Sequence, residues 1–460
     1  MMAKISLAAF LLAPTLLHAR DAPPAGGPPR PFTIPHKERF SLPNGLQGTL
    51  VSFGQVPKVN VTVLVRTGNL NEGEHTWLAD LTGELMREGT ATLDGSELAR
   101  MAARMGGAIG VAVGADQTSV GADVLSEFGP ELVQLLADVT MAPRLPESEL
   151  PRIKADFERN LAISRTQPQA QAAEALAQVL YGDHPYGHTF PTEAQLEAYG
   201  IEDLRAYHAA NFGAARTEVL VVGKFDAAAM RAAIERAFGG WAHGPEPLVN
   251  VPKVADQPQL RLLPRPGAPQ TTLYLAEPTI DPSQPGYTKL AVANTLLGGF
   301  FSSRITRNLR EDKGYTYSPA STIGSHYRTA YWVQTADVTT DVSGPALTEV
   351  FREIERLRTE APSAEELDRV KGYITGTFVL GNASRGGLLG QLAFLELHGL
   401  PDSYLSEYVS RVESVTPEDV RNAAQTYLDP AKMSLIVVGD LDVVKPQLEA
   451  VPALAGLMKK

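Results

Sequence analysis

Two kinds of apolar pattern predict β-strands along the chain. Residues 45–53 and 59–66 are runs rich in strand-forming residues that follow the turn dipeptide Asn44-Gly45, and residues 108–125 alternate between apolar and polar side chains. Val219–Val222 is a continuous apolar run, which is typical of a buried strand. The second half of the chain contains runs of the same kinds, and there we expect strands near residues 259–265, 271–277 and 316–338.

Helical periodicity fills the segments between these strands. In the first half, apolar residues three or four positions apart predict helices near residues 77–88, 94–106, 127–140 and 146–164. In the second half, the same spacing predicts helices near residues 287–297, 343–358 and 363–400. Each half therefore runs from strands through helices to a final strand. This order predicts an α+β fold in which a mostly antiparallel sheet has helices packed on one side.

The two halves are copies of one pattern. Ile201–Arg205 followed by Val219–Asp226 recurs as Pro417–Arg421 followed by Leu435–Asp442, at an offset of 216 residues. A repeat of this length indicates a duplicated domain. At 460 residues the chain is also longer than one domain usually is, since domains average roughly 150 residues.

A Gly- and Pro-rich stretch separates the copies. Gly239–Pro247 has the composition of a linker. We therefore predict an N-terminal domain over residues 36–238, a linker over 239–258 and a C-terminal domain over 259–460, the two domains being homologous.

The N-terminus has the features of a secretory signal. Lys4 precedes an apolar run, Ile5–Leu17, and Ala19 offers a small-residue cleavage site. We expect residues 1–19 to be a signal peptide and residues 20–35, rich in Pro and Gly, to be a flexible leader. Export to the periplasm of a Gram-negative cell is the simplest interpretation.

Charge and composition exclude several classes of protein. The net charge of −11 argues against nucleic acid or an anionic membrane as a partner. The chain has no cysteine, which excludes disulfides and thiolate metal sites. After the N-terminal signal, no apolar stretch reaches the roughly 18 residues of a membrane-spanning helix.

The predicted helix near residues 77–88 carries the most informative motif. The segment Trp77–Thr90 reads WLADLTGELMREGT, and it resembles the H-x-x-E-H helix of the pitrilysin-type (inverzincin) zinc metallopeptidases. Asp80, Gly83 and Glu84 occupy the three working positions. Zinc hydrolysis needs two imidazoles and a carboxylate base there, so we expect no zinc site in this chain. Asp80 and Glu84 are most simply a solvated helix face, with a weak site for a hard cation as the alternative.

A second motif of the same family is intact in the second half. Residues 298–304 and 309–318 read GGFFSSR and LREDKGYTYS, which places Arg310 and Tyr317 on the family's Arg and Tyr positions. The resemblance implies that this pair reaches the zinc site of the other half or of a partner chain and holds the substrate near its scissile carbonyl. The alternative is structural: Arg310 pairs with a neighbouring carboxylate such as Glu311 or Asp312, and Tyr317 packs at the start of a strand.

Other candidate metal ligands are weak. The resemblance implies a third zinc ligand in the helix near residues 146–164, but Asn160 is the best-aligned position and Glu158 is offset from it. His184 and His188 have helical spacing, but the intervening Pro185 and Gly187 disfavour a helix. His75 needs no function beyond that of a solvated loop residue.

These features lead to one main hypothesis and two alternatives. The resemblance implies a non-zinc subunit of a heterodimeric zinc metallopeptidase, with zinc held by a homologous H-x-x-E-H subunit and with peptides as substrates. In that heterodimer this chain contributes Arg310 and Tyr317 and binds no cofactor itself. The first alternative is a non-proteolytic periplasmic protein that binds peptides or assists assembly. The second is an autonomous hydrolase with an unusual metal site at Asp80 and Glu84.

Overall fold

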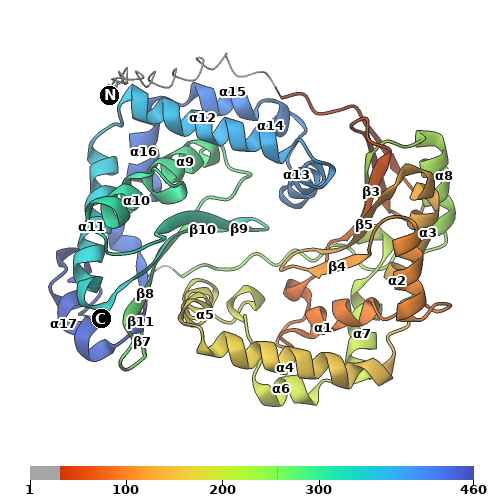
Figure 1. Cartoon of the computed structure of the whole chain (residues 1–460), viewed down its shortest axis with the longest axis horizontal. Helices are drawn as coiled ribbons and strands as arrows, with labels where there is room; N and C mark the ends of the chain where they lie inside the picture. Colours follow the sequence, from red (N-terminus) through yellow and green to blue (C-terminus); the bar gives the residue numbers. More distant parts are fainter. Residues whose placement is uncertain (1–31, 256, 460) are drawn as a thin grey trace, which may run out of the picture. The chain divides into compact units, whose positions relative to one another are not determined.

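The computed structural model of the chain describes residues 32–255 and 257–459 (Figure 1). The predicted signal peptide and most of the predicted leader lie outside these ranges. None of the helices within the described ranges is long and apolar enough to cross a membrane.

The first half contains a six-stranded sheet. Its strands are β1 (Lys37–Ser41), β2 (Gln47–Ser52), β3 (Lys58–Val65), β4 (Gly110–Val113), β5 (Thr118–Leu125) and β6 (Thr217–Gly223). They lie in the order β1-β2-β6-β3-β5-β4, and only the β2–β6 pair is parallel. Every residue of β6 is buried, as its continuous apolar run predicts.

The second half contains a five-stranded sheet with the same plan. Its strands are β7 (Leu260–Pro264), β8 (Gln270–Thr279), β9 (Ala320–His326), β10 (Thr329–Thr339) and β11 (Ser434–Gly439). Their order is β7-β11-β8-β10-β9, with β7–β11 as the parallel pair. This is the order of the first sheet without its edge strand β1, which the sequence analysis does not predict. The duplicated, mostly antiparallel α+β fold is thus confirmed.

The helices follow in the same order in both halves. Those of the first half are α1 (Leu78–Met86), α2 (Gly95–Arg104), α3 (Gly129–Met141), α4 (Leu150–Thr166), α5 (Pro168–Tyr181), α6 (Glu193–Ala198), α7 (Ile201–Asn211) and α8 (Ala227–Phe238). Those of the second half are α9 (Tyr287–Asn294), α10 (Arg304–Thr306), α11 (Ser343–Thr359), α12 (Ala364–Gly381), α13 (Arg385–His398), α14 (Ser403–Ser406), α15 (Tyr408–Ser414), α16 (Pro417–Tyr427) and α17 (Leu441–Glu449).

The second half departs from regular helix in two places. The helix predicted near residues 287–297 continues beyond α9 as a π-helical turn, Thr295–Gly299, and α10 continues as a second π-helical turn, Arg307–Asp312.

The predicted helical segment 363–400 consists of two helices, α12 and α13. The Ser384 hydroxyl caps α13 by accepting a hydrogen bond from the amide of Gly387, which starts a new helix in place of a continued one.

Each sheet has two apolar faces, and helices of different halves cover them. One face of each sheet forms a core with helices of its own half. The other face of the first sheet, with Leu64 and Leu220, packs against Leu388 and Leu392 of α13 from the second half. The guanidinium of Arg385, at the start of α13, also donates two hydrogen bonds to the Asp123 carboxylate of β5, at 2.9 and 3.2 Å.

The second sheet is covered in the reciprocal way. Leu176 and Val179 of α5, from the first half, pack against Ala276, Ile436 and Val438 of the second sheet. α5 is not among the helices that the sequence analysis predicts. Its apolar residues Ala172, Ala175, Leu176 and Val179 nevertheless have helical spacing.

Truncation of a buried side chain on α13, the helix that covers the first sheet, should therefore destabilise the protein. Leu388 is fully buried against the first sheet, so we expect Leu388→Ala to lower the free energy of unfolding by about 2–4 kcal/mol. Leu380→Ala is the matched control, because the Leu380 side chain is 75% exposed, and it should change stability by less than about 0.5 kcal/mol. Urea unfolding measures both, and equal effects would contradict the packing described.

Candidate functional site

The helix of the degenerate zinc motif, α1, is held at its N-terminus by a buried carboxylate. Trp77, just before the helix, has a left-handed backbone conformation with φ of 69°. The amides of Trp77 and Ala79 donate to the two carboxylate oxygens of Glu72, at 3.1 and 2.9 Å. Glu72 is only 6% exposed, and burial raises its pKa to about 8 even though these amides favour the charged form. No sequence motif singled out Glu72.

Asp80 and Glu84 lie one turn apart on α1 but in different surroundings. Asp80 is half-buried and accepts a hydrogen bond from Asn69 Nδ2 at 2.7 Å. Burial raises its pKa, opposed by that hydrogen bond. Glu84 instead pairs with Arg87 at 3.0 Å, with nearly half of each side chain exposed. The expected solvated face is therefore confirmed for Glu84 and wrong for Asp80, which is half-buried and lines a cavity together with residues of the second half of the chain.

Gly83, at the position of the catalytic base in the motif, is closed off by β4. A Cβ atom at Gly83 would lie 2.6 Å from Val113 Cγ2 and 3.4 Å from Val111 Cγ1. Any side chain at this position needs β4 or its valines to move. Packing as well as sequence therefore separates α1 from a working metal helix.

The other candidate ligands do not gather around α1. Glu158 and Asn160 are exposed on α4. His184 accepts a hydrogen bond from the Tyr186 amide, while His188 contacts the carbonyl of Asp183, and a 3₁₀ turn separates the two rings. His75 is exposed. Within residues 32–255 and 257–459, no three His, Asp or Glu side chains are placed to hold one metal ion.

Arg310 lies between two exposed aromatic rings. Its guanidinium carbon is 4.5 Å from the ring centre of Tyr317 and 4.6 Å from that of Phe301, so each ring makes a cation–π contact. Tyr317 is 76% and Phe301 60% exposed. Across the described part of the chain, no carboxylate forms an ion pair with Arg310. The structural alternative, in which Arg310 pairs with Glu311 or Asp312 and Tyr317 packs at the start of a strand, does not describe this arrangement, because Tyr317 is exposed and no such ion pair is present among the described residues.

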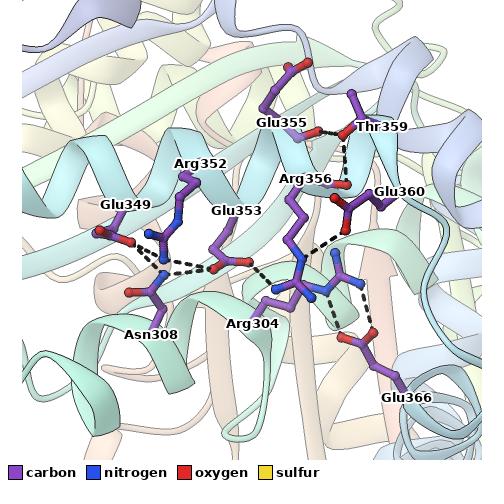
Figure 2. Close-up of polar contacts among 10 residues, drawn as sticks. All are labelled: Arg304, Asn308, Glu349, Arg352, Glu353, Glu355, Arg356, Thr359, Glu360 and Glu366. Carbon is purple, nitrogen blue, oxygen red and sulfur yellow. Dashed lines mark hydrogen bonds and ion pairs between the residues drawn. The ribbon is translucent and has the colours of Figure 1, made fainter.

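A buried polar network fixes the segment that carries Arg310. Figure 2 shows Arg304 bound through two guanidinium nitrogens to Glu366 of α12, both at 2.8 Å, and Asn308 bridging Glu349 and Glu353 of α11 at 2.9 and 2.8 Å. Burial acts to raise the pKa of Glu366, but Arg304 outweighs it, and the pKa is lowered. These bonds attach the helical segment that carries Arg310 to α11 and α12, so the backbone of Arg310 is held in a fixed position.

The site thus has two parts with opposite chemistry. Around Arg310 the protein presents a guanidinium and a phenol, both hydrogen-bond donors, to the exterior. Around α1 it retains two partly or fully buried carboxylates without a metal-binding set. The sequence motif identified Arg310 and Tyr317 but not Phe301. The sequence feature that could have identified Phe301 is a large apolar residue in a Gly-rich turn.

Restoration of the motif residues should not restore a zinc site. We expect the triple variant Asp80→His, Gly83→Glu and Glu84→His to hold much less than one zinc per chain after dialysis, measured by elemental analysis. The glutamate side chain introduced at position 83 collides with Val113, and a third ligand is lacking. The double variant without Gly83→Glu is the matched control, and the triple variant should be less stable than it by about 1–3 kcal/mol. One tightly held zinc per chain would contradict this account.

The raised pKa of Glu72 predicts a pH-dependent stability. A carboxyl group whose pKa rises from 4.5 to about 8 on folding binds more protons in the folded state, so its contribution is complete below pH 4.5 and is lost as the pH rises through about 8. We expect the wild-type protein to lose stability over this window relative to Glu72→Gln, by at most about 1.4 kcal/mol per pH unit. Urea unfolding of both proteins from pH 5 to 9 measures this. Parallel curves would refute the assignment to Glu72.

Two protein-family models match this chain. Residues 51–191 match the family model described as insulinase (peptidase family M16), and residues 200–373 match the model described as the peptidase M16 inactive domain. Together these matches cover more than half of the chain and confirm the resemblance drawn from the two motifs.

Curated relatives align over most of the chain. An uncharacterized zinc protease of Mycobacterium tuberculosis is 25% identical over 433 residues, covering 90% of this chain and 96% of the relative. The uncharacterized zinc protease YmxG of Bacillus subtilis is 24% identical over 410 residues, covering 87% and 98%. A protein of Helicobacter pylori, 20% identical over 382 residues and covering 81% and 87%, is described as a non-peptidase homolog.

Solved structures share the fold. A peptidase M16 inactive domain from Pseudomonas fluorescens superimposes with a TM-score of 0.81 at 24% identity, covering 88% of this chain and 98% of that one. A protease from Helicobacter pylori gives the same TM-score at 18% identity, covering 88% and 100%. With both family models, the two motifs and the duplicated fold in agreement, the chain belongs to the M16, or pitrilysin-type, family of peptidases.

Proposed function

We propose that this chain is the non-zinc subunit of a heterodimeric zinc metallopeptidase that degrades or processes peptides. The observation that carries the proposal is the contrast between the two parts of the site. Arg310 is rigidly held, half-buried between two exposed rings and unpaired by any carboxylate in the described residues, whereas the motif helix α1 lacks the ligands and the space that zinc chemistry needs.

The chemistry of Arg310 and Tyr317 fits a donor role in peptide hydrolysis. When water attacks a peptide carbonyl, the carbon forms a new C–O bond and the carbonyl oxygen takes up negative charge. A guanidinium and a phenol held near that oxygen stabilise it by hydrogen bonds that strengthen as the charge grows. Zinc and the general base, which activate the water, would belong to the H-x-x-E-H partner.

The exposure of these side chains supports a role at an interface. Aromatic and arginine side chains are enriched among the residues that contribute most of the binding energy at protein–protein interfaces, and here two aromatic rings and an arginine lie together. Aromatic and arginine side chains exposed together favour a surface that becomes covered by a partner or a substrate. The predicted signal peptide supports a periplasmic location for this complex.

A non-proteolytic role in peptide binding or assembly is the second candidate. It is favoured by the Helicobacter pylori relative described as a non-peptidase homolog. The edge strands β4 and β9 also leave one side of each sheet without a neighbouring strand, where an extended peptide can add. In this case function persists when zinc is removed from any associated protein.

Isolation of the natural complex separates the two candidates. Tagged residues 20–460 are recovered from a periplasmic extract of the native host, and the co-purifying proteins are identified by mass spectrometry. The proposal expects a stoichiometric H-x-x-E-H chain of similar size and peptide cleavage that chelators abolish. Recovery of this chain alone, without activity, would favour the binding protein.

Substitutions in the donor pair test the assigned roles. With the partner present, we expect Arg310→Ala to lower kcat by about 10²–10³-fold, because one donor to the developing charge is lost. Tyr317→Phe, which keeps the ring over Arg310 but removes the hydroxyl, should lower kcat without weakening assembly. Arg205→Ala on α7 is the matched control, since Arg205 pairs with Glu202 on the same helix and with no other carboxylate among the described residues. Unchanged turnover in an intact heterodimer would reject the roles of both residues.

A further inference from the structure

A cavity of about 390 Å³ lies between α1, α5 and the second sheet. Aromatic side chains form much of its wall: Trp77, Tyr181, Tyr186, Tyr274 and Tyr331. The first three come from the first half of the chain and the last two from β8 and β10. The reciprocal packing of the halves therefore creates the cavity.

The cavity is acidic and has no fixed cation. Glu72 and Asp80 both line it, while none of its lining residues is a lysine or an arginine. Their polar partners are neutral: Asn69 donates to both carboxylates, and backbone amides donate to Glu72. Burial is the main cause that raises the pKa of Glu72, and the nearby charge of Asp80 raises it further. Two neighbouring buried carboxylates without a counter-charge favour either protons or a cationic ligand.

The remaining polar groups leave a hydrogen-bonding position open. Tyr181 is 5% exposed, and among the described residues its hydroxyl has no hydrogen bond of standard geometry, although the nearby Thr329 side chain acts to lower its pKa. Two histidines also line the cavity. His326 stacks on Tyr186 and faces Asp116 at 3.5 Å, and His188 contacts a backbone carbonyl. Such a buried hydroxyl is available to hydrogen-bond a ligand atom or a water molecule in the cavity.

The walls favour an organic cation over a metal ion. Calcium takes six to eight oxygen ligands and zinc prefers imidazole or thiolate, and the described residues offer no group of three His, Asp or Glu side chains for either. Aromatic faces bind ammonium groups through cation–π attraction, and the attraction increases when the site is desolvated. A lining that combines two carboxylates with several aromatic rings suits a charged head on an apolar stem.

We infer that this cavity binds an alkylammonium group, with Glu72 and Asp80 at the charged head and the Trp77 and Tyr181 rings around the stem. The same chemistry is found in a lysine side chain, a peptide N-terminus and a free amine. The site does not depend on the proposed function, because it belongs to this chain alone and requires neither Arg310 nor a partner.

Binding of n-butylammonium to the mature chain tests the site. Ligand-observed NMR titration should show saturable binding to one site, with n-butanol, the neutral analogue, binding at least about tenfold more weakly. Asp80→Asn keeps the oxygen that accepts from Asn69 but removes the charge, and it should raise Kd about tenfold. Glu235→Gln on α8, which pairs with Arg231 and does not line the cavity, is the matched control and should leave Kd unchanged.

A second variant keeps the test independent of charge. Ala177 lies at the cavity wall, so Ala177→Leu should fill part of the space and weaken n-butylammonium binding while Glu72 and Asp80 stay intact. Circular dichroism confirms that each variant is folded. Absent saturation, equal affinity for n-butanol, an unchanged Kd in folded Asp80→Asn, or displacement by equimolar Mg²⁺ would each overturn the inference.

Competition then identifies the source of the ammonium group. An acetylated tripeptide amide with a central lysine offers only a side-chain amine, and an unacetylated tripeptide amide with a central glutamine offers only the terminal amine. Displacement of n-butylammonium by the first assigns the site to lysine side chains, and displacement by the second assigns it to peptide N-termini. Displacement by neither, with n-butylammonium still bound, assigns it to free amines.

Discussion

The exchange of one helix between the two halves is the constraint on which the rest of the structure depends. Each sheet is apolar on both faces, and its own helices cover only one of them. α13 covers the second face of the first sheet, and α5 covers that of the second sheet. Each buried leucine in these contacts contributes roughly 1.5–3 kcal/mol, so neither half hides its apolar surface alone.

The same exchange of helices determines which residues surround the N-terminus of α1. Because α5 lies on the second sheet, the N-terminus of α1 comes to face β8 and β10, and the aromatic cavity forms between them. Glu72, the carboxylate that caps α1, lines this cavity as a buried group with a raised pKa.

Duplication allowed the two halves to diverge in chemistry while they kept one fold. α2 in the first half is a regular helix, whereas its counterpart in the second half, α10 with its π-helical turn, carries Arg310. Polar contacts to α11 and α12 hold that turn, and π-helical turns are frequent at functional sites. In the first half, the position equivalent to a catalytic base became Gly83, and Val113 of β4 occupies the space. The two halves therefore differ in local packing at these positions while they share one fold.

The sequence by itself determined the duplicated α+β plan, most strands, about half of the helices, and the positions of Asp80, Gly83, Arg310 and Tyr317, because periodicity and short motifs are local properties of the chain. It did not reveal β1, because this strand is short and lacks a strong alternating pattern. It also did not reveal α5, whose alanine-rich apolar face is explained only by its packing against the second sheet. Only the tertiary structure decided that Asp80 is half-buried, that Phe301 stacks on Arg310 and that Glu72 shares an aromatic cavity with Asp80. Burial, pKa and stacking depend on residues that are distant in sequence, and folding alone brings them together.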